Sequence, residues 1–238
     1  MRKHVNKIKI MAVATAVTAM LAVVVAELNA GGDPVTVRAL VLTDLGDPGD
    51  IVTRMQAHSW EVTTSGVLPL LASETDGFSA FNLVWIPAQA NFPGIHRLVS
   101  SGALDMFIKQ GGVLVLADAN PEGVWPDLAP GVADVEALPA GGAGPLTITA
   151  PEHPMITGEG TGGVPVTAED LDPQGTGGRA CVINAPQEDG LLVVASNTLG
   201  PVLVEHTHGS GRVLISALLN ATENCVQNTL LYIQSIVQ

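Results

Sequence analysis

The chain has 238 residues, 47% of them hydrophobic and 3% aromatic, with 23 acidic against 10 basic residues. A formal net charge of −13 argues against binding to nucleic acid or anionic membranes, so we expect neither as a partner. The length suits one domain with a full hydrophobic core.

The N-terminus has the pattern of a secretory signal peptide. Four Lys or Arg lie within residues 2–9, an uncharged apolar run covers residues 10–26, and small residues permit cleavage after Ala26 or Ala30. Cleavage would leave residues 31–238 with six basic against 22 acidic residues, a net charge near −16, and a secreted or periplasmic location. The alternative is an uncleaved membrane anchor, because the run is only slightly shorter than the ~20 residues that span a bilayer.

Apolar, β-branched runs alternate with helical patterns in the first ninety residues of the predicted domain. This alternation predicts a parallel sheet with helices on both faces. The expected strands are 35–43, 61–67, 83–87 and 113–117, and the expected helices are 51–58 and a segment between Pro93 and Gly111 that breaks near Ser100–Gly102. Gly111 and Gly112 form a strong helix stop.

Residues 121–178 are rich in Gly and Pro and lose periodicity, which predicts an irregular insertion with short β pieces at 146–149 and 164–167. The sheet is expected to resume afterwards and to end in an antiparallel hairpin and a helix. The strands predicted there are 180–183, 191–196, 201–207 and 212–216, with a turn at 208–211 and a last helix capped near Thr222.

Several segments together resemble the class I glutamine amidotransferase-like superfamily, most closely its ThuA-like and related extracytoplasmic branches. They are FNLVWIPAQA (81–90), KQGGVLVLAD (109–118), PEHPMITG (151–158) and VEHTHGSGRVLISALLN (204–220). The resemblance covers most of residues 36–238. It implies an α/β fold, a flavodoxin-like three-layer sandwich with a mostly parallel central sheet and an antiparallel hairpin near the C-terminus.

The resemblance also implies where a catalytic triad would lie. Catalytic members carry a nucleophilic Cys on the turn after the strand that matches 113–117, where backbone N–H groups activate it. In this chain the turn is Asp118-Ala119-Asn120-Pro121, and the family's His is missing near 218–220. We therefore expect no amide hydrolysis by this route, and more generally a protein that is not an enzyme.

Acidic residues follow two predicted strands. Asp44 and Asp118, at strand ends, offer oxygen ligands for Mg²⁺ or Ca²⁺, so a divalent metal is an alternative to our expectation of no cofactor. Asp47 and Asp50 have a simpler explanation, because with Pro48 between them they fit an N-cap and an N3 acid of the first helix.

His206 and His208 are two residues apart on a predicted strand and therefore share one face, which makes them weak zinc candidates. A third ligand would have to be His153 or Glu205, and Glu205 faces the opposite way. The alternative is that both histidines lie at the solvent side of a hairpin.

Cys181 and Cys225 are the two cysteines. In an oxidising compartment they are disulfide candidates, and two buried thiols are the alternative. Cys225 also lies in the first turn of the last helix, where a Cys–His pair with His206 or His208 is conceivable but less favoured than a disulfide or packing.

We interpret the chain as a non-catalytic secreted or periplasmic binding or scaffolding domain, with residues 1–30 as signal peptide and 31–238 as the domain. Its partner would be a protein or a carbohydrate, contacted through Asp44, Asp118, Asn120 and Trp125, whereas Trp85 belongs to the core. The alternatives are a metal- or carboxylate-dependent enzyme acting on carbohydrate, by fold-level analogy, and a self-assembling structural module.

Overall fold

The computed structural model describes ten stretches of the chain. They are residues 35–43, 48–66, 77–87, 98, 100–117, 134–137, 144–175, 181–184, 190–218 and 221–237. One compact unit spans Thr36–Gln238 and contains every described helix and strand.

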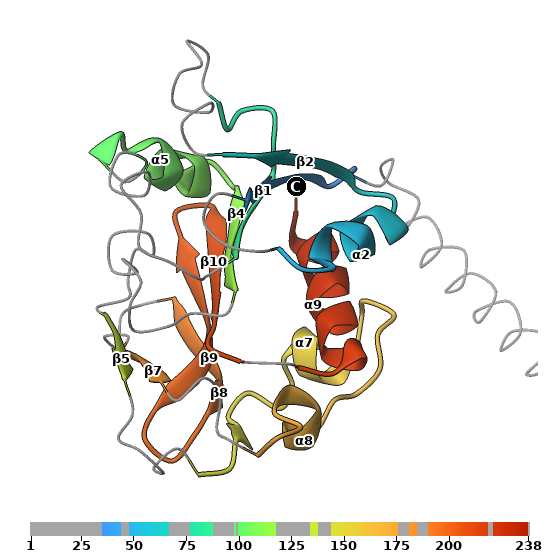
Figure 1. Cartoon of the computed structure of the whole chain (residues 1–238), viewed down its shortest axis with the longest axis vertical. Coiled ribbons are helices and arrows are strands. Elements are labelled where there is room, and N and C mark those ends of the chain that lie inside the picture. Colours follow the sequence, from blue (N-terminus) through green and yellow to red (C-terminus); the bar gives the residue numbers. More distant parts are fainter. Residues whose placement is uncertain are drawn as a thin grey trace, which may run out of the picture. The chain divides into compact units, whose positions relative to one another are not determined.

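The unit is built on a mixed eight-stranded sheet (Figure 1). Its strands are β1 (Arg38–Leu42), β2 (Glu61–Ser65), β3 (Leu83–Pro87), β4 (Val113–Ala117), β6 (Thr147–Ile148), β8 (Leu191–Ser196), β9 (Pro201–His208) and β10 (Gly211–Ser216). They lie in the order β2-β1-β3-β4-β10-β9-β8-β6. All neighbours from β2 to β10 pair in parallel, and those from β10 to β6 pair antiparallel. The expected mostly parallel sheet with a C-terminal hairpin is confirmed.

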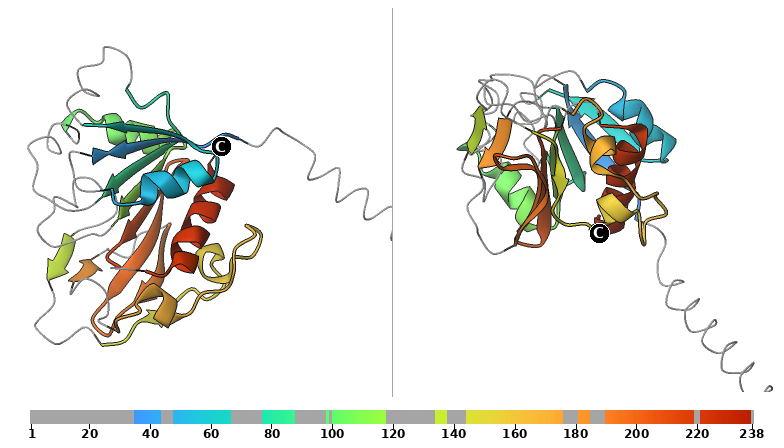
Figure 2. Two further views of the ribbon diagram at one scale, coloured as in Figure 1. Left: turned by 45° about the vertical axis from the view of Figure 1, so that its right-hand side comes forward. Right: turned by 90° about the horizontal axis from the view of Figure 1, so that it is seen from below.

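Helices cover both faces of the sheet (Figure 2). Helices α2 (Ile51–Ala57) and α9 (Glu223–Ile236) lie on one face, and α5 (Ala103–Lys109) lies on the other. Strands β3 and β4 are apolar on both of their faces and almost completely buried, as central parallel strands between two helix layers must be. Trp85 in β3 is 8% exposed and belongs to the core, as predicted. This is an α/β fold of the flavodoxin-like three-layer type.

The predicted break in the segment before Gly111 is confirmed. Leu98 and Ser100 are helical, Ser101 and Gly102 form a turn, and α5 begins at Ala103 after Gly102 adopts a left-handed φ of 68°. The helix ends at Lys109 with Gln110 as its C-cap residue, and Gly111 follows with a φ of 106°. Glycine tolerates both conformations because it lacks a Cβ atom.

The irregular region contains two short helices that the sequence interpretation missed. Helix α7 (Pro154–Thr157) begins after His153, whose side chain accepts the Met155 N–H, and helix α8 (Ala168–Leu171) begins with a capping box between Thr167 and Asp170. Both starts have recognisable signals, a proline at the first helical position and the Thr-x-x-Asp spacing. The β piece expected at 164–167 is not a strand, since these residues lead into the α8 cap.

Two further expectations need correction. The strand near residue 180 is β7 (Cys181–Asn184), which pairs with β5 (Asp134–Ala137) in a separate two-stranded sheet and not with the main one. Asp50 is the N-cap residue of α2 rather than its N3 acid, and its carboxylate pairs with Arg54 instead of capping a backbone N–H.

Candidate functional site

A pocket of about 260 Å³ opens toward the carboxyl ends of the central parallel strands. We call it the carboxyl-end pocket. It is lined by Asp50, Ile51, Trp85, Val115, Ala117, Met155, Leu203, Leu214, Ser216, Leu218, Ala221, Cys225, Val226 and Thr229. Open α/β sheets bind their ligands at this end of the strands, so the pocket is the candidate site.

The floor of the pocket follows from strand register. Trp85, Val115 and Leu214 are register partners across β3, β4 and β10, so their side chains share one face of the sheet. The opposite wall is α9, where Cys225 and Thr229 are four residues apart and hence lie on one side of the helix. The pocket is therefore a gap in the packing between sheet and helix, lined mainly by apolar side chains.

The polar groups at the floor and wall already have partners. The Ser216 hydroxyl accepts the Leu218 N–H at 3.3 Å, and the Thr229 hydroxyl donates to the Cys225 carbonyl at 2.9 Å. No histidine occurs among the described residues that line the pocket. Within the described stretches, therefore, no imidazole base of the kind that activates a nucleophile lines the pocket beside these hydroxyls.

Cys225 is a buried thiol, 7% exposed, and the structure has it free rather than in a disulfide. Burial, together with the negative charge of Asp170, raises its pKa to about 12. The thiol therefore stays protonated at neutral pH, and the thiolate is the nucleophilic form. The side chain of Cys181 lies outside the described residues.

Charged residues lie at the rim of the pocket. The Arg54 guanidinium binds the Asp50 carboxylate at 2.7 Å and also pairs with Glu223, joining the start of α2 to the start of α9. The hydrogen bond from Arg54 lowers the pKa of Asp50. Both acids are largely exposed, so water screens these pairs and they contribute little to stability.

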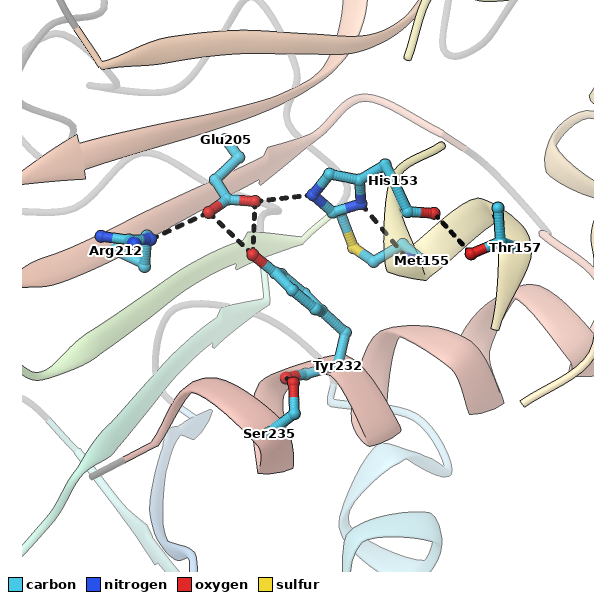
Figure 3. Close-up of polar contacts among 7 residues, drawn as sticks. All are labelled: His153, Met155, Thr157, Glu205, Arg212, Tyr232 and Ser235. Atoms are coloured by element: carbon cyan, nitrogen blue, oxygen red, sulfur yellow. Dashed lines mark hydrogen bonds and ion pairs between the residues drawn. The ribbon is translucent and has the colours of Figure 1, made fainter. Parts of the chain in front are cut away.

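A buried polar cluster lies beside the pocket and centres on Glu205 of β9 (Figure 3). One carboxylate oxygen accepts the His153 Nε2–H at 2.8 Å, and the Tyr232 hydroxyl lies 2.8 and 2.9 Å from the two oxygens. The Arg212 Nε lies 3.0 Å from the carboxylate. We call these four residues the Glu205 cluster. They join β9, β10, α9 and the start of α7.

The hydrogen bonds fix the protonation of the cluster. His153 Nδ1 accepts the Met155 N–H at 3.2 Å, so Nε2 carries the proton that is donated to Glu205. Burial raises the pKa of Glu205, but the hydrogen bonds from His153 and Tyr232 outweigh it and lower the pKa from its usual value of 4.5. Burial and the neighbouring carboxylate raise the pKa of Tyr232. The cluster is an ionised acid whose acceptors are occupied by the protein itself.

The two predicted zinc candidates lie on the other side of the sheet. His206 and His208 have ring centroids 6.1 Å apart, and His208 Nε2 lies 2.7 Å from a carboxylate oxygen of Asp105 in α5. Glu205 faces the opposite way from the two histidines, as expected. It points toward α9 and binds His153, so neither Glu205 nor His153 can join the histidine pair. His206 and His208 lie on the α5 side of the sheet and Cys225 lies on the α9 side, so neither of these two histidines can pair with Cys225. The structure brings no three His, Cys, Asp or Glu side chains together for a metal within its described stretches.

The other predicted site residues lie outside the described residues. They are Asp44, Asp118, Asn120 and Trp125. The helices of the described part also include none that is long and apolar enough to cross a membrane.

Sequence reasoning missed the Glu205 cluster as a unit, although one signal was present. Glu205 is an acid that directly follows the apolar run 202–204 in the same predicted strand, and such a residue must find partners if it is buried. His153 lies 52 residues away and Tyr232 lies 27 residues away, so spacing alone could not identify them.

No protein-family model matches the chain, and no curated protein matches it. Solved structures, in contrast, match the chain. A proposed subunit of GMP synthase from Thermoplasma acidophilum is 12% identical over 84% of this chain and 95% of that chain, with a TM-score of 0.51. A cytoplasmic protein from Salmonella typhimurium is 12% identical over 86% of this chain and 100% of its own, with a TM-score of 0.49. The first likeness is a relationship of fold to a glutamine amidotransferase-like protein.

Proposed function

We propose that this protein is a non-catalytic binding or scaffolding domain of the class I glutamine amidotransferase-like superfamily, from a ThuA-like or related extracytoplasmic branch. It is exported to the periplasm or the cell exterior by its N-terminal segment. Its carboxyl-end pocket binds an apolar ligand group, carried by a small molecule or by a side chain of a partner protein.

The observation that carries this proposal is the chemistry of the pocket. An apolar space of about 260 Å³ lies at the carboxyl ends of the parallel strands, and its thiol, Cys225, is protonated at neutral pH. The turn after β4 has no Cys, Ser or Thr. A site of this kind offers van der Waals contact and desolvation and no activated nucleophile.

Benzene tests the proposal because its size and chemistry suit the pocket. A dry apolar cavity of roughly 150 Å³ is sufficient to bind it. Ligand that binds the folded state alone raises stability, by about 1.4 kcal/mol at ten times the dissociation constant. We expect the melting temperature of the full chain to rise with benzene concentration.

Two alanine-to-phenylalanine variants separate the pocket from the surface. Ala221→Phe places a ring at a half-buried position that lines the pocket, and Ala57→Phe places one at the exposed end of α2. The benzene-dependent rise should vanish in Ala221→Phe and persist in Ala57→Phe. An equal rise in both variants would refute binding at this pocket.

A further inference from the structure

A second pocket, of about 420 Å³, lies at the opposite end of the parallel strands. We call it the amino-end pocket. It is lined by Arg38, Phe78, Ser79, Phe81, Asn82, Phe107, Gln110, Gly111, Gly112 and Ser210. These residues come from the starts of β1, β3, β4 and β10 and from the end of α5. Its volume falls within the range of pockets that hold small molecules.

One wall of this pocket is aromatic. Phe78 and Phe107 are buried and their rings lie 5.7 Å apart at an angle of 42°, and Phe81 is half-buried beside them. Four phenylalanines exist in the whole chain, so three of them gather at this pocket. The aromatic side chains add apolar contact area to the pocket, against which a flat apolar group can pack.

Arg38 supplies the charge. The structure describes four Lys or Arg residues: Arg54, Lys109 and Arg212 each pair with an acid, whereas Arg38 makes no ion pair within the described part of the chain. A cation that has no acidic partner among the described residues is unexpected in a protein of net charge −13. A guanidinium that lines a pocket is suited to bind a carboxylate through two parallel hydrogen bonds.

The backbone that carries Arg38 is held in place. The Asn82 side chain accepts the Arg38 N–H at 2.7 Å and donates to the Thr36 carbonyl at 3.1 Å, and the Asn82 N–H donates to the Arg38 carbonyl at 3.0 Å. The side chain itself is exposed. The backbone position of the cation is therefore fixed, and binding has only the Arg38 side chain to order.

The charge environment favours a ligand with a single negative charge. Glu61 is the register partner of Arg38 on the neighbouring strand and lies on the same face, so it opposes a doubly charged anion more strongly than a singly charged one. The last turn of α5 also borders the pocket, but the Phe107, Ile108 and Lys109 carbonyls accept N–H groups from Gly112, Gly111 and Ser210. Those carbonyls therefore oppose an anion less than a bare helix end would.

We propose that the amino-end pocket binds an aromatic monocarboxylate, with its carboxylate on Arg38 and its ring against Phe78 and Phe107. This site is separate from the carboxyl-end pocket and does not depend on the function proposed for it.

Phenylacetate is the probe, and NMR titration of the full chain is the measurement. We expect phenylacetate to shift the amide signals of Gly111, Gly112 and Ser210, and Arg38→Gln to weaken its binding roughly ten- to hundredfold, since charged hydrogen bonds are worth about 1.5–3 kcal/mol. Lys109→Gln removes the same charge next to the pocket and should change the affinity less than about twofold.

Phenylacetamide, a neutral molecule of the same shape, provides a test that needs no variant. It should bind the unmodified chain at least about tenfold more weakly than phenylacetate does. The proposal would be overturned if phenylacetate and phenylacetamide bound equally well. It would also be overturned if Arg38→Gln and Lys109→Gln lost the same affinity for phenylacetate, or if phenylacetate shifted only the signals of other residues. If Arg38→Gln does not fold, the comparison of the two compounds decides alone.

Discussion

At the scale of single residues, Glu205 shows how a buried acid is accommodated. Its side chain is 8% exposed, and it is held by the imidazole of His153, the phenol of Tyr232 and the guanidinium of Arg212. Removing a carboxylate from water is costly, and the donors offset that cost only because all three reach it. The cluster therefore ties α7 and α9 to β9, and this fixes one end of the carboxyl-end pocket.

Glu205→Gln should destabilise the protein by about 1–3 kcal/mol at neutral pH, because an amide cannot accept from all three donors or balance Arg212. The pKa of Glu205 is lowered in the folded state, so its contribution is present above the unfolded value near 4.5 and is lost as pH falls through the folded value. Urea denaturation of the variant and the unmodified chain at several pH values measures this difference.

The same substitution at the exposed Glu159 is the control, and it should change stability by less than about 0.5 kcal/mol. We expect the gap between Glu205→Gln and the unmodified chain to narrow as the pH falls below 4.5. A gap that is absent at pH 7, or that widens in acid, would contradict the assigned role of Glu205.

Residue patterns predicted the face of the sheet on which a side chain lies better than they predicted the residues that it contacts. Alternation along β9 correctly set Glu205 and His206 on opposite faces, since successive side chains of a strand must alternate. It could not show that His208 meets Asp105 of α5, 103 residues earlier, or that Glu205 meets Tyr232. Those contacts depend on which helix covers which face, and a local pattern does not contain that information.

At the scale of elements, the β9–β10 hairpin is fitted against α5. Gly209, in its two-residue turn, has a φ of 63°, and a Cβ atom there would lie 2.7 Å from the Lys109 Cα. The Ser210 N–H donates to the Lys109 carbonyl at 3.2 Å. The turn thus needs glycine both for its conformation and for its close approach to the end of the helix.

Gly209→Ala should therefore destabilise the protein more than Gly160→Ala does. Gly160 has a similar φ of 74° but open space around its missing Cβ, so its substitution costs only the left-handed conformation, about 1 kcal/mol. The additional loss at Gly209 reports the contact with α5. Equal losses for the two variants in urea denaturation would show that the close approach has no energetic role.

The elements of the parallel half were predictable because their signals are local and redundant. Continuous apolar runs bounded by glycine and polar residues predicted β3 and β4 at their observed bounds. The region after residue 121 was harder, because α7 and α8 are single turns of four residues, too short for a helical period to appear. Their capping residues were the available signal.

At the scale of the whole molecule, the carboxyl-end pocket is assembled from distant segments. Its walls come from residues near 50, 85, 115, 155, 203–218 and 221–229. The sequence indicated which end of the sheet to inspect, because parallel strands place their ligand sites at their carboxyl ends. It could not indicate a gap of about 260 Å³, since volume depends on how closely α9 packs on the sheet.

NMR mapping of bound benzene tests the central claim, that the strand ends bind an apolar group, most directly. Titration of the full chain should shift the signals of Val115 and Leu214 on the pocket floor and of Cys225 on the opposite wall, and Ala221→Phe should abolish these shifts. Signals that stay unmoved at these three residues, or that move equally in Ala221→Phe, would contradict binding at this site.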